Sequence, residues 1–182
     1  MAGLSGRSAI LGLTMHDPER PTPWTSVRRE GDKAALYAEL AGELDALLAD
    51  ERDRVANAAN AAAAIYHALG ALNWAGFYFL HGSELILGPF QGRPACVRIP
   101  LGKGVCGTAA AQRRSVLVPD VSAYPGHIAC DSQSRSELVV PLIVGGTVLG
   151  VLDLDSPKPS RFSADDQAGI ERLAAIFLKA TS

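Results

Sequence analysis

Long apolar runs are absent from this 182-residue sequence, and so is any marked excess of one charge. No stretch approaches the roughly 18–20 apolar residues that a membrane-spanning helix requires, so we expect no membrane span. The 17 basic and 19 acidic residues leave a net charge of −2, which gives no electrostatic basis for binding nucleic acid or a membrane surface. We therefore expect neither partner.

Cysteine is also scarce. The three cysteines are Cys96, Cys106 and Cys130, and none belongs to a CxxC pair. A small, odd number fits a reducing cytosol better than a disulfide framework. The N-terminal run SAILGLTMH lacks a small-residue cleavage site and the C-terminal KATS carries no retention signal, so we expect the protein to be cytoplasmic.

Motifs that hold metals or cofactors are missing as well. A zinc site usually takes four ligands grouped in close pairs, whereas these cysteines are 10 and 24 positions apart and only His127 lies near one of them. The glycines of LGKGVCG (101–107) lack the GK[ST] ending of a phosphate loop. We predict no metal and no cofactor.

What is present is the composition of a globular chain, with 48% hydrophobic and 20% charged residues. Residues 1–30 contain three prolines and no sustained periodicity, which predicts an N-terminal extension outside the core. Residues 31–182 are long enough for one domain with a sizeable core.

Four segments have helical patterns. Asp32 is a candidate cap for a first helix with leucines at three- and four-residue intervals, and a second helix is predicted over 52–70. Its predicted buried stripe is Val55, Ala59, Ala62, Ile65, Tyr66 and Leu69. A short helix is predicted over 105–113, and Ser163 heads a final amphipathic helix.

Strand patterns fill the region between the second and the last helix. They cover 74–80, 84–90, 95–101 and 115–121, and a hairpin around Gly145 and Gly146. Residues 122–135 have no regular pattern. This order predicts an α+β fold around an antiparallel sheet, because strands and helices do not alternate as in a parallel doubly wound sheet.

Cys130 lies in the polar stretch GHIACDSQSRSE, between His127 and Asp131. That context is typical of an accessible thiol, and His127 is placed to help lower its pKa. Cys106, in the apolar GVCGTA, has the pattern of an inert buried residue. A cysteine hydrolase built on a Cys–His pair is conceivable, but no orienting third residue stands out.

Three carboxylates are candidates for a polar pocket. Strand alternation places Asp153 and Asp155 on one face, while Glu137 opens the partner strand of the hairpin. A strict two-residue turn would send Glu137 to the opposite face. A longer loop, or a bulge near Pro141, would pair Glu137 with Asp155, and we expect this second arrangement. Converging acids raise at least one pKa and so keep a proton donor near neutral pH.

Aromatic residues are few, at 6%, but four of them share one predicted strand. Trp74 and Tyr78 fall on one face, and Phe77 and Phe79 on the other. One face belongs to the core. We expect the pair Trp74 and Tyr78 to form the wall of a pocket for a methyl or thioether group.

Taken together, NWAGFYFL, LILGPFQGRPACVRIPLGKGVCGTA, PGHIACDSQSRSELVVPL and GVLDLDSP resemble the free methionine-(R)-sulfoxide reductases, which are stand-alone GAF-domain enzymes. The resemblance runs from about residue 33 to 180. It implies a six-stranded antiparallel sheet flanked by helices, a homodimer, and reduction of free L-methionine (R)-S-oxide through a sulfenic acid and an intramolecular disulfide. Thioredoxin is the implied reductant.

The resemblance also implies roles for single residues. Cys130 falls on the nucleophile, Cys96 on the resolving thiol and Cys106 on an auxiliary thiol. Glu137, Asp153 and Asp155 fall on acids around the sulfoxide and the amino group, and Glu137 and Asp155 act there as proton donor or polarise the sulfoxide. Trp74 and Tyr78 fall on the aromatic wall.

Two other functions stay open at this point. One is a ligand-sensing GAF module that binds without turnover, and the other is a peroxide sensor that uses the same thiols. Sensing modules usually sit beside an effector domain, for which we expect no room in this chain. The sequence does not assign the acid that donates the proton, or the part that Cys106 plays relative to Cys96.

Overall fold

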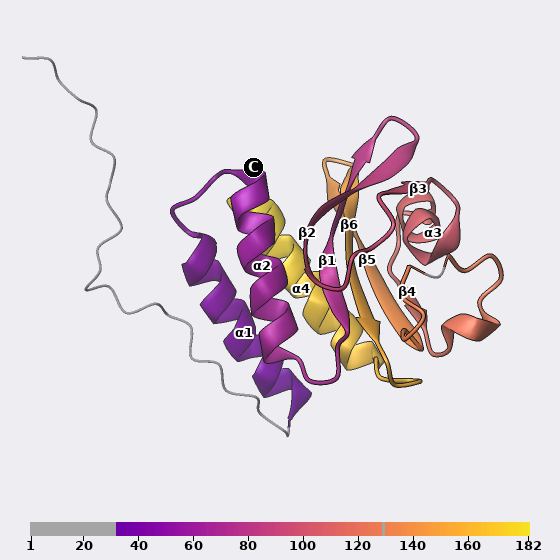
Figure 1. Ribbon diagram of the computed structural model, residues 1–182. Helices are drawn as coiled ribbons and strands as arrows, with labels where there is room; N and C mark the ends of the chain where they lie inside the picture. Colours follow the sequence, from indigo (N-terminus) through magenta and orange to yellow (C-terminus); the bar gives the residue numbers. More distant parts are fainter. Residues whose placement is uncertain (1–31, 129) are drawn as a thin grey trace, which may run out of the picture.

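The computed structural model describes residues 32–128 and 130–182 (Figure 1). The predicted N-terminal extension, residues 1–30, lies outside the described residues. The elements that follow are α1 (Lys33–Leu48), α2 (Arg54–Ala68), β1 (Trp74–His81), β2 (Glu84–Gly92), β3 (Arg98–Pro100), α3 (Gly104–Gln112), β4 (Val116–Val118), the 3-10 turn η1 (Val121–Ala123), β5 (Ser136–Val144), β6 (Thr147–Ser156) and α4 (Ala164–Ala180).

In the described part of the chain the strands form one antiparallel sheet with the order β3-β2-β1-β6-β5-β4. Helices α1, α2 and α4 form a layer on one face of the sheet, while α3 packs on the opposite face (Figure 1). The predicted α+β fold is therefore confirmed. No helix among the described residues is long and apolar enough to cross a membrane.

Side-chain caps explain where the main helices begin. Asp32 accepts a hydrogen bond from the amide of Ala34, and Asp53 accepts two at the start of α2. Ser163 and Asp166 form a capping box that starts α4. Each cap satisfies amides that the first helical turn leaves without a partner, as predicted for Asp32 and Ser163.

The buried face of α2 differs from the predicted stripe. Val55 is 59% exposed and Ala59 is also exposed, while the buried side chains are Asn57, Ala58, Ala61, Ala62, Ala64 and Ile65. The alanine-rich run offers small side chains all round the helix, so its sequence does not distinguish one face from another. Nδ2 of the buried Asn57 donates to the carbonyl oxygen of Glu51, while its Oδ1 has no hydrogen-bond partner among the described residues.

Two strands are shorter than predicted. The candidate over 95–101 keeps only Arg98–Pro100, and the candidate over 115–121 keeps only Val116–Val118. β4 stops before Pro119, which has no amide hydrogen to donate to a ladder. Residues 94–97 leave the sheet, and this departure carries Cys96 toward the loop that holds Cys130.

The β5–β6 hairpin has the register that keeps the acids together. Gly145 and Gly146 form a two-residue turn with positive φ angles, but the pairing shifts between Leu142 and Ile143, so that Leu149 is an extra residue on β6. Glu137 consequently pairs with Asp155. The predicted bulge is confirmed, one residue beyond Pro141.

The sheet separates two apolar clusters. Phe77 and Phe79 point into the layer of α1, α2 and α4, where the ring of Phe77 lies 4.6 Å from that of Phe177. Trp74 and Tyr78 belong to the cluster on the other face, with α3. The two faces predicted for this strand are therefore confirmed, and the second face holds the site.

Candidate active site

A pocket lies between the second face of the sheet, the start of α3 and the loop before β5. The enclosed space in this oxidised structure is small, with a cavity volume of about 30 Å³. Seven of the eight predicted site residues line it: Trp74, Tyr78, Cys106, Cys130, Glu137, Asp153 and Asp155. The eighth, Cys96, is joined to it through a disulfide.

That disulfide links Cys96 to Cys130 across 34 positions of sequence. The two Cα atoms are 5.3 Å apart, a usual separation for a bridged pair. Both cysteines are half-buried, Cys96 on the segment that follows β2 and Cys130 on the loop before β5. The structure is thus that of the oxidised chain, with one bridged sulfur on the pocket wall.

The carboxylates come from two neighbouring strands. Glu137 on β5 and Asp153 on β6 are only 6% and 5% exposed, and Asp155 lies opposite Glu137. Burial raises the pKa of Glu137 and of Asp153 well above the ordinary range, and repulsion among the acids adds to it. Burial raises the pKa of Asp155 to about 7. The pocket therefore holds carboxyl groups that keep a proton at near-neutral pH.

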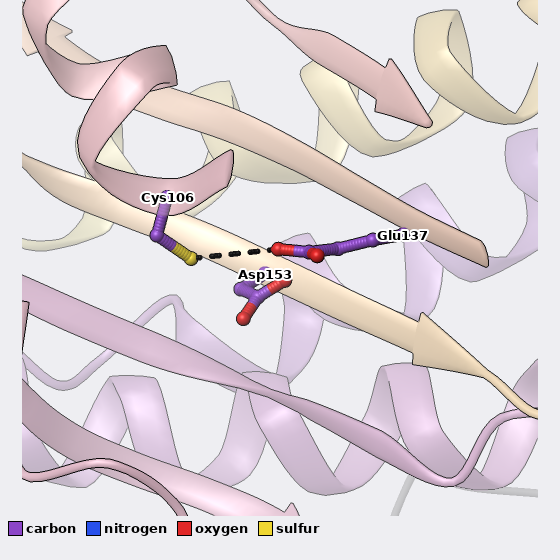
Figure 2. Close-up of side chains that lie close together, drawn as sticks. All are labelled: Cys106, Glu137 and Asp153. Atoms are coloured by element: carbon purple, nitrogen blue, oxygen red, sulfur yellow. Dashed lines mark hydrogen bonds between the residues drawn. The ribbon is translucent and has the colours of Figure 1, made fainter. Parts of the chain in front are cut away.

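Cys106 is buried, as its apolar sequence predicted, but it is not surrounded by hydrocarbon alone. Its Sγ lies 3.9 Å from Oε1 of Glu137, and Figure 2 shows both side chains converging with Asp153. Burial and the neighbouring carboxylates raise its pKa, so the thiol stays protonated. The approach of α3 to the strands depends on Gly107, because a Cβ there would lie 2.3 Å from the carbonyl oxygen of Pro100.

His127 lies beside the acid cluster, with its Nε2 3.6 Å from Oε2 of Glu137. It lines the same pocket as Cys130, and its help in lowering the pKa of that thiol stays a prediction. Its own burial lowers the pKa of the imidazole, which favours the neutral form. The loop turns at Gly126, with φ of +73°, and directs His127 to the acid cluster. His127 therefore contacts a carboxyl group.

The aromatic wall is held by hydrogen bonds as well as by stacking. Trp74 stacks on Tyr78 and on Phe90, with ring centres 5.8 and 5.3 Å apart. The indole of Trp74 donates to the carbonyl oxygen of Arg93, and the hydroxyl of Tyr78 donates to that of Cys96. These hydrogen bonds therefore hold the aromatic side chains and the segment that carries Cys96 in position relative to one another. Phe90 was not among the predicted wall residues.

A second group of polar residues, which was not predicted from the sequence, lies beside the pocket. Nδ2 of Asn73 donates to Asp131 and to Ser134, at 3.0 Å each, and a hydrogen bond with Ser134 also lowers the pKa of Asp155. This network ties the loop after Cys130 to the start of β1. The partners are 58 and 61 positions apart, so no spacing could have revealed them.

Comparison with known proteins agrees with this geometry. The GAF domain family model matches residues 43–179. The free methionine-R-sulfoxide reductase of Escherichia coli is 48% identical over 144 residues, which are 79% of this chain and 87% of that protein. The free methionine-R-sulfoxide reductase of Saccharomyces cerevisiae is 50% identical over 133 residues, 69% of this chain and 74% of that protein.

A solved structure shows the same likeness in three dimensions. The free methionine-R-sulfoxide reductase of Neisseria meningitidis, in complex with its substrate, superposes with a TM-score of 0.82 and 48% identity, covering 85% of this chain and 93% of that one. Fold, sequence and coverage agree. The chain therefore belongs to the GAF domain family and, within it, to the free methionine-R-sulfoxide reductases.

Proposed function

We propose that this chain reduces free L-methionine (R)-S-oxide to L-methionine at the pocket that holds Cys130, with Cys96 as the resolving thiol. The observation that carries the proposal is one arrangement: a half-buried disulfide on the wall of a pocket whose interior holds three carboxyl groups. Sulfoxide reduction needs both parts, because the sulfur becomes electrophilic only as its oxygen is protonated.

In the first step the Cys130 thiolate attacks the sulfoxide sulfur. Glu137 and Asp155 are the proton donors to the oxygen, and a pKa of about 7 suits Asp155 to this role near neutral pH. The products are methionine and a sulfenic acid on Cys130, so the substrate sulfur gains the two electrons that the cysteine loses. The Cys96 thiol then attacks the sulfenic sulfur, which releases water and forms the disulfide.

Recognition of a free amino acid follows from the same residues. Glu137, Asp153 and Asp155 attract the ammonium group, which peptide-bound methionine lacks. Trp74 and Tyr78 form the wall against the methyl group at sulfur. Cys106, at the bottom of the acid cluster, serves as an auxiliary thiol.

Recycling requires an external dithiol, and we assign this role to thioredoxin. The bridge is half-buried, so a partner thiolate can reach it. The reduced enzyme then operates in a reducing compartment, which we take to be the cytoplasm, and as a homodimer. Thioredoxin and the homodimer rest on the family, whereas the cytoplasm rests on the small, odd number of cysteines.

The test is consumption of the free R form, the free S form and a peptide-bound form of methionine sulfoxide, with dithiothreitol as reductant. We expect turnover of the free R form only. Cys130→Ser should abolish turnover, whereas reduced Cys96→Ser, mixed with substrate in the absence of dithiothreitol, should still complete one turnover per chain. Full multiple turnover in Cys130→Ser would overturn the proposal, and binding without any reduction would favour the sensing module.

A further inference from the structure

We propose that Cys106, Glu137 and Asp153 form a reversible site for Zn²⁺ and similar thiophilic divalent cations, and that a bound cation excludes the substrate. The second half of this statement rests on the proposed function, because it assigns the substrate's ammonium group to the same carboxylates. The first half concerns the geometry of the three side chains alone.

The three ligand atoms already lie close together. One atom from each side chain, the Sγ of Cys106 and a carboxylate oxygen from each acid, falls within 4.8 Å of the other two. A tetrahedral zinc ion with Zn–S and Zn–O bonds of about 2.3 and 2.0 Å holds sulfur and oxygen about 3.5 Å apart. The Sγ of Cys106 is 3.9 Å from Oε1 of Glu137, so this pair needs only a small contraction.

The cluster also contains an unsatisfied polar atom. Oδ1 of Asp153 is buried, and within residues 32–128 and 130–182 no donor reaches it. Among the same residues no lysine or arginine forms an ion pair with Glu137 or Asp153. A buried carboxyl oxygen without a hydrogen-bond partner is uncommon and costs free energy. A cation would supply the missing partner, and its binding would release the protons that the two acids and the thiol carry.

The type of donor selects the type of cation. Thiolate and carboxylate together suit Zn²⁺, whereas Mg²⁺ and Ca²⁺ prefer oxygen ligands alone. The three side chains come from three different elements, α3, β5 and β6, and converge on one point (Figure 2). The fourth position is open to water, or to His127, whose Nε2 lies 3.6 Å from Oε2 of Glu137.

The oxidised protein allows a clean test, because two of its three cysteines are bridged and Cys106 is the remaining thiol. Titration with Co²⁺ should produce a thiolate-to-cobalt charge-transfer band and the visible bands of tetrahedral cobalt, saturating at one ion per chain. Zn²⁺ should abolish these bands, and Mg²⁺ at the same concentration should not. Absence of the charge-transfer band, or equal displacement by Mg²⁺, would overturn the site.

Variants connect the signal to the residues. Cys106→Ser should remove the charge-transfer band, and Asp153→Asn should weaken cobalt binding at least ~10-fold. Asp120→Asn is the matched control, because this exposed carboxylate lies outside the pocket and should leave binding unchanged. A charge-transfer band that survives Cys106→Ser, or unchanged affinity in a folded Asp153→Asn, would contradict the assignment.

Competition tests the exclusion of substrate. Free methionine sulfoxide should raise the apparent dissociation constant for Co²⁺ more than alanine does, since alanine chelates the metal in solution through the same amino and carboxylate groups. Equal effects of the two amino acids would refute exclusion. The reductase assay is done without added metal, so failure of the metal site leaves the proposed function standing, and failure of the reductase leaves the cobalt signal standing.

Discussion

The two faces of the sheet are made by the same strands and differ in what they bury. On β6, Leu152 and Leu154 point into the layer of α1, α2 and α4, while Asp153 and Asp155 point into the pocket. On the first face the described core is mostly hydrophobic, and two of its buried polar residues, Asn57 and Asp166, lie on α2 and α4, not on the sheet. The second face combines an apolar cluster with buried acids and a thiol.

This difference shows how one strand can serve stability and chemistry at once. Burying Leu152 and Leu154 is favourable, on the order of 1.5–3 kcal/mol for each side chain. Burying a carboxyl group is unfavourable for its charged form, and the raised pKa values of Glu137 and Asp153 record that cost. A substitution on the helix face should therefore affect folding, and one on the pocket face should affect the reaction.

The largest effect is expected on the pocket face. Glu137→Gln removes a proton donor but keeps the shape of the side chain, so kcat/KM for free methionine sulfoxide should fall by roughly 10²–10⁴. The free energy of unfolding should stay the same or rise, because a buried ionisable group is replaced by a neutral one. Steady-state kinetics and urea unfolding of the oxidised protein measure the two. A loss of stability with normal kinetics would contradict the expected division of roles between the two faces of the sheet.

For Leu152, the neighbour of Asp153 on β6, we expect a loss of stability with little loss of activity. Leu152→Ala leaves a cavity in the core on the helix side of the sheet and should lower the free energy of unfolding by about 2–5 kcal/mol. Activity per folded molecule should stay close to that of the wild type, because Leu152 does not line the pocket. Urea unfolding, with kinetics at a temperature where the variant is folded, would show this. A catalytic defect as large as that of Glu137→Gln would contradict it.

The pH dependence of stability should be dominated by the pocket face. The pKa of Asp155 rises from 3.8 to about 7 on folding, so between these values the folded state binds more protons than the unfolded state. Stability should therefore fall as the pH rises through this window, by on the order of 2–4 kcal/mol. The raised pKa values of Glu137 and Asp153 act in the same direction.

Asp155→Asn tests this dependence because it should flatten the fall between about pH 4 and 7. Asp166, on the helix face, has a lowered pKa, so its contribution is lost only at acid pH, below the window. Urea unfolding at a series of pH values would measure both. An unchanged slope in Asp155→Asn would show that this carboxyl group is ionised at the same pH in both states.

The smallest effect is expected at a polar network on the helix face. The hydroxyl of Tyr37 donates to Asp166, which is 1% exposed and also pairs with Lys33 and Arg161. Tyr37→Phe should lower the free energy of unfolding by about 1 kcal/mol, the usual contribution of one hydrogen bond, and leave kcat/KM unchanged. Thermal unfolding and kinetics would show it. A changed KM would mean that the two faces are coupled.

Local patterns in the sequence were enough to predict most elements and the two faces of β1. They could not settle the hairpin register, because the extra residue Leu149 has no signal of its own and both registers fit the alternation of apolar and polar residues. The exposed Val55 was predicted to be buried for a similar reason, because the sequence of an alanine-rich helix does not indicate which of its faces packs against the core.

The candidate site could be predicted where the neighbouring residues in the sequence indicate the role of a side chain. This is so for Cys130 in a polar loop and for the two aspartates in an apolar strand. It was not predictable where tertiary contacts decide. His127 contacts Glu137, and Cys106 joins two acids, only because α3 and the loop fold over β5 and β6. Spacing along the chain predicts no metal site, but it carries no information on how Asp153 lies beside Cys106, on which the proposed cation site depends.

The most direct test of the central claim is a single-turnover measurement. Fully reduced protein, freed of reductant, is mixed with excess free L-methionine (R)-S-oxide, and methionine and free thiols are counted. We expect one methionine per chain, a fall from three free thiols to one, and a peptide cross-linked through Cys96 and Cys130. Three remaining thiols with no methionine formed, or a cross-link that involves Cys106, would contradict it.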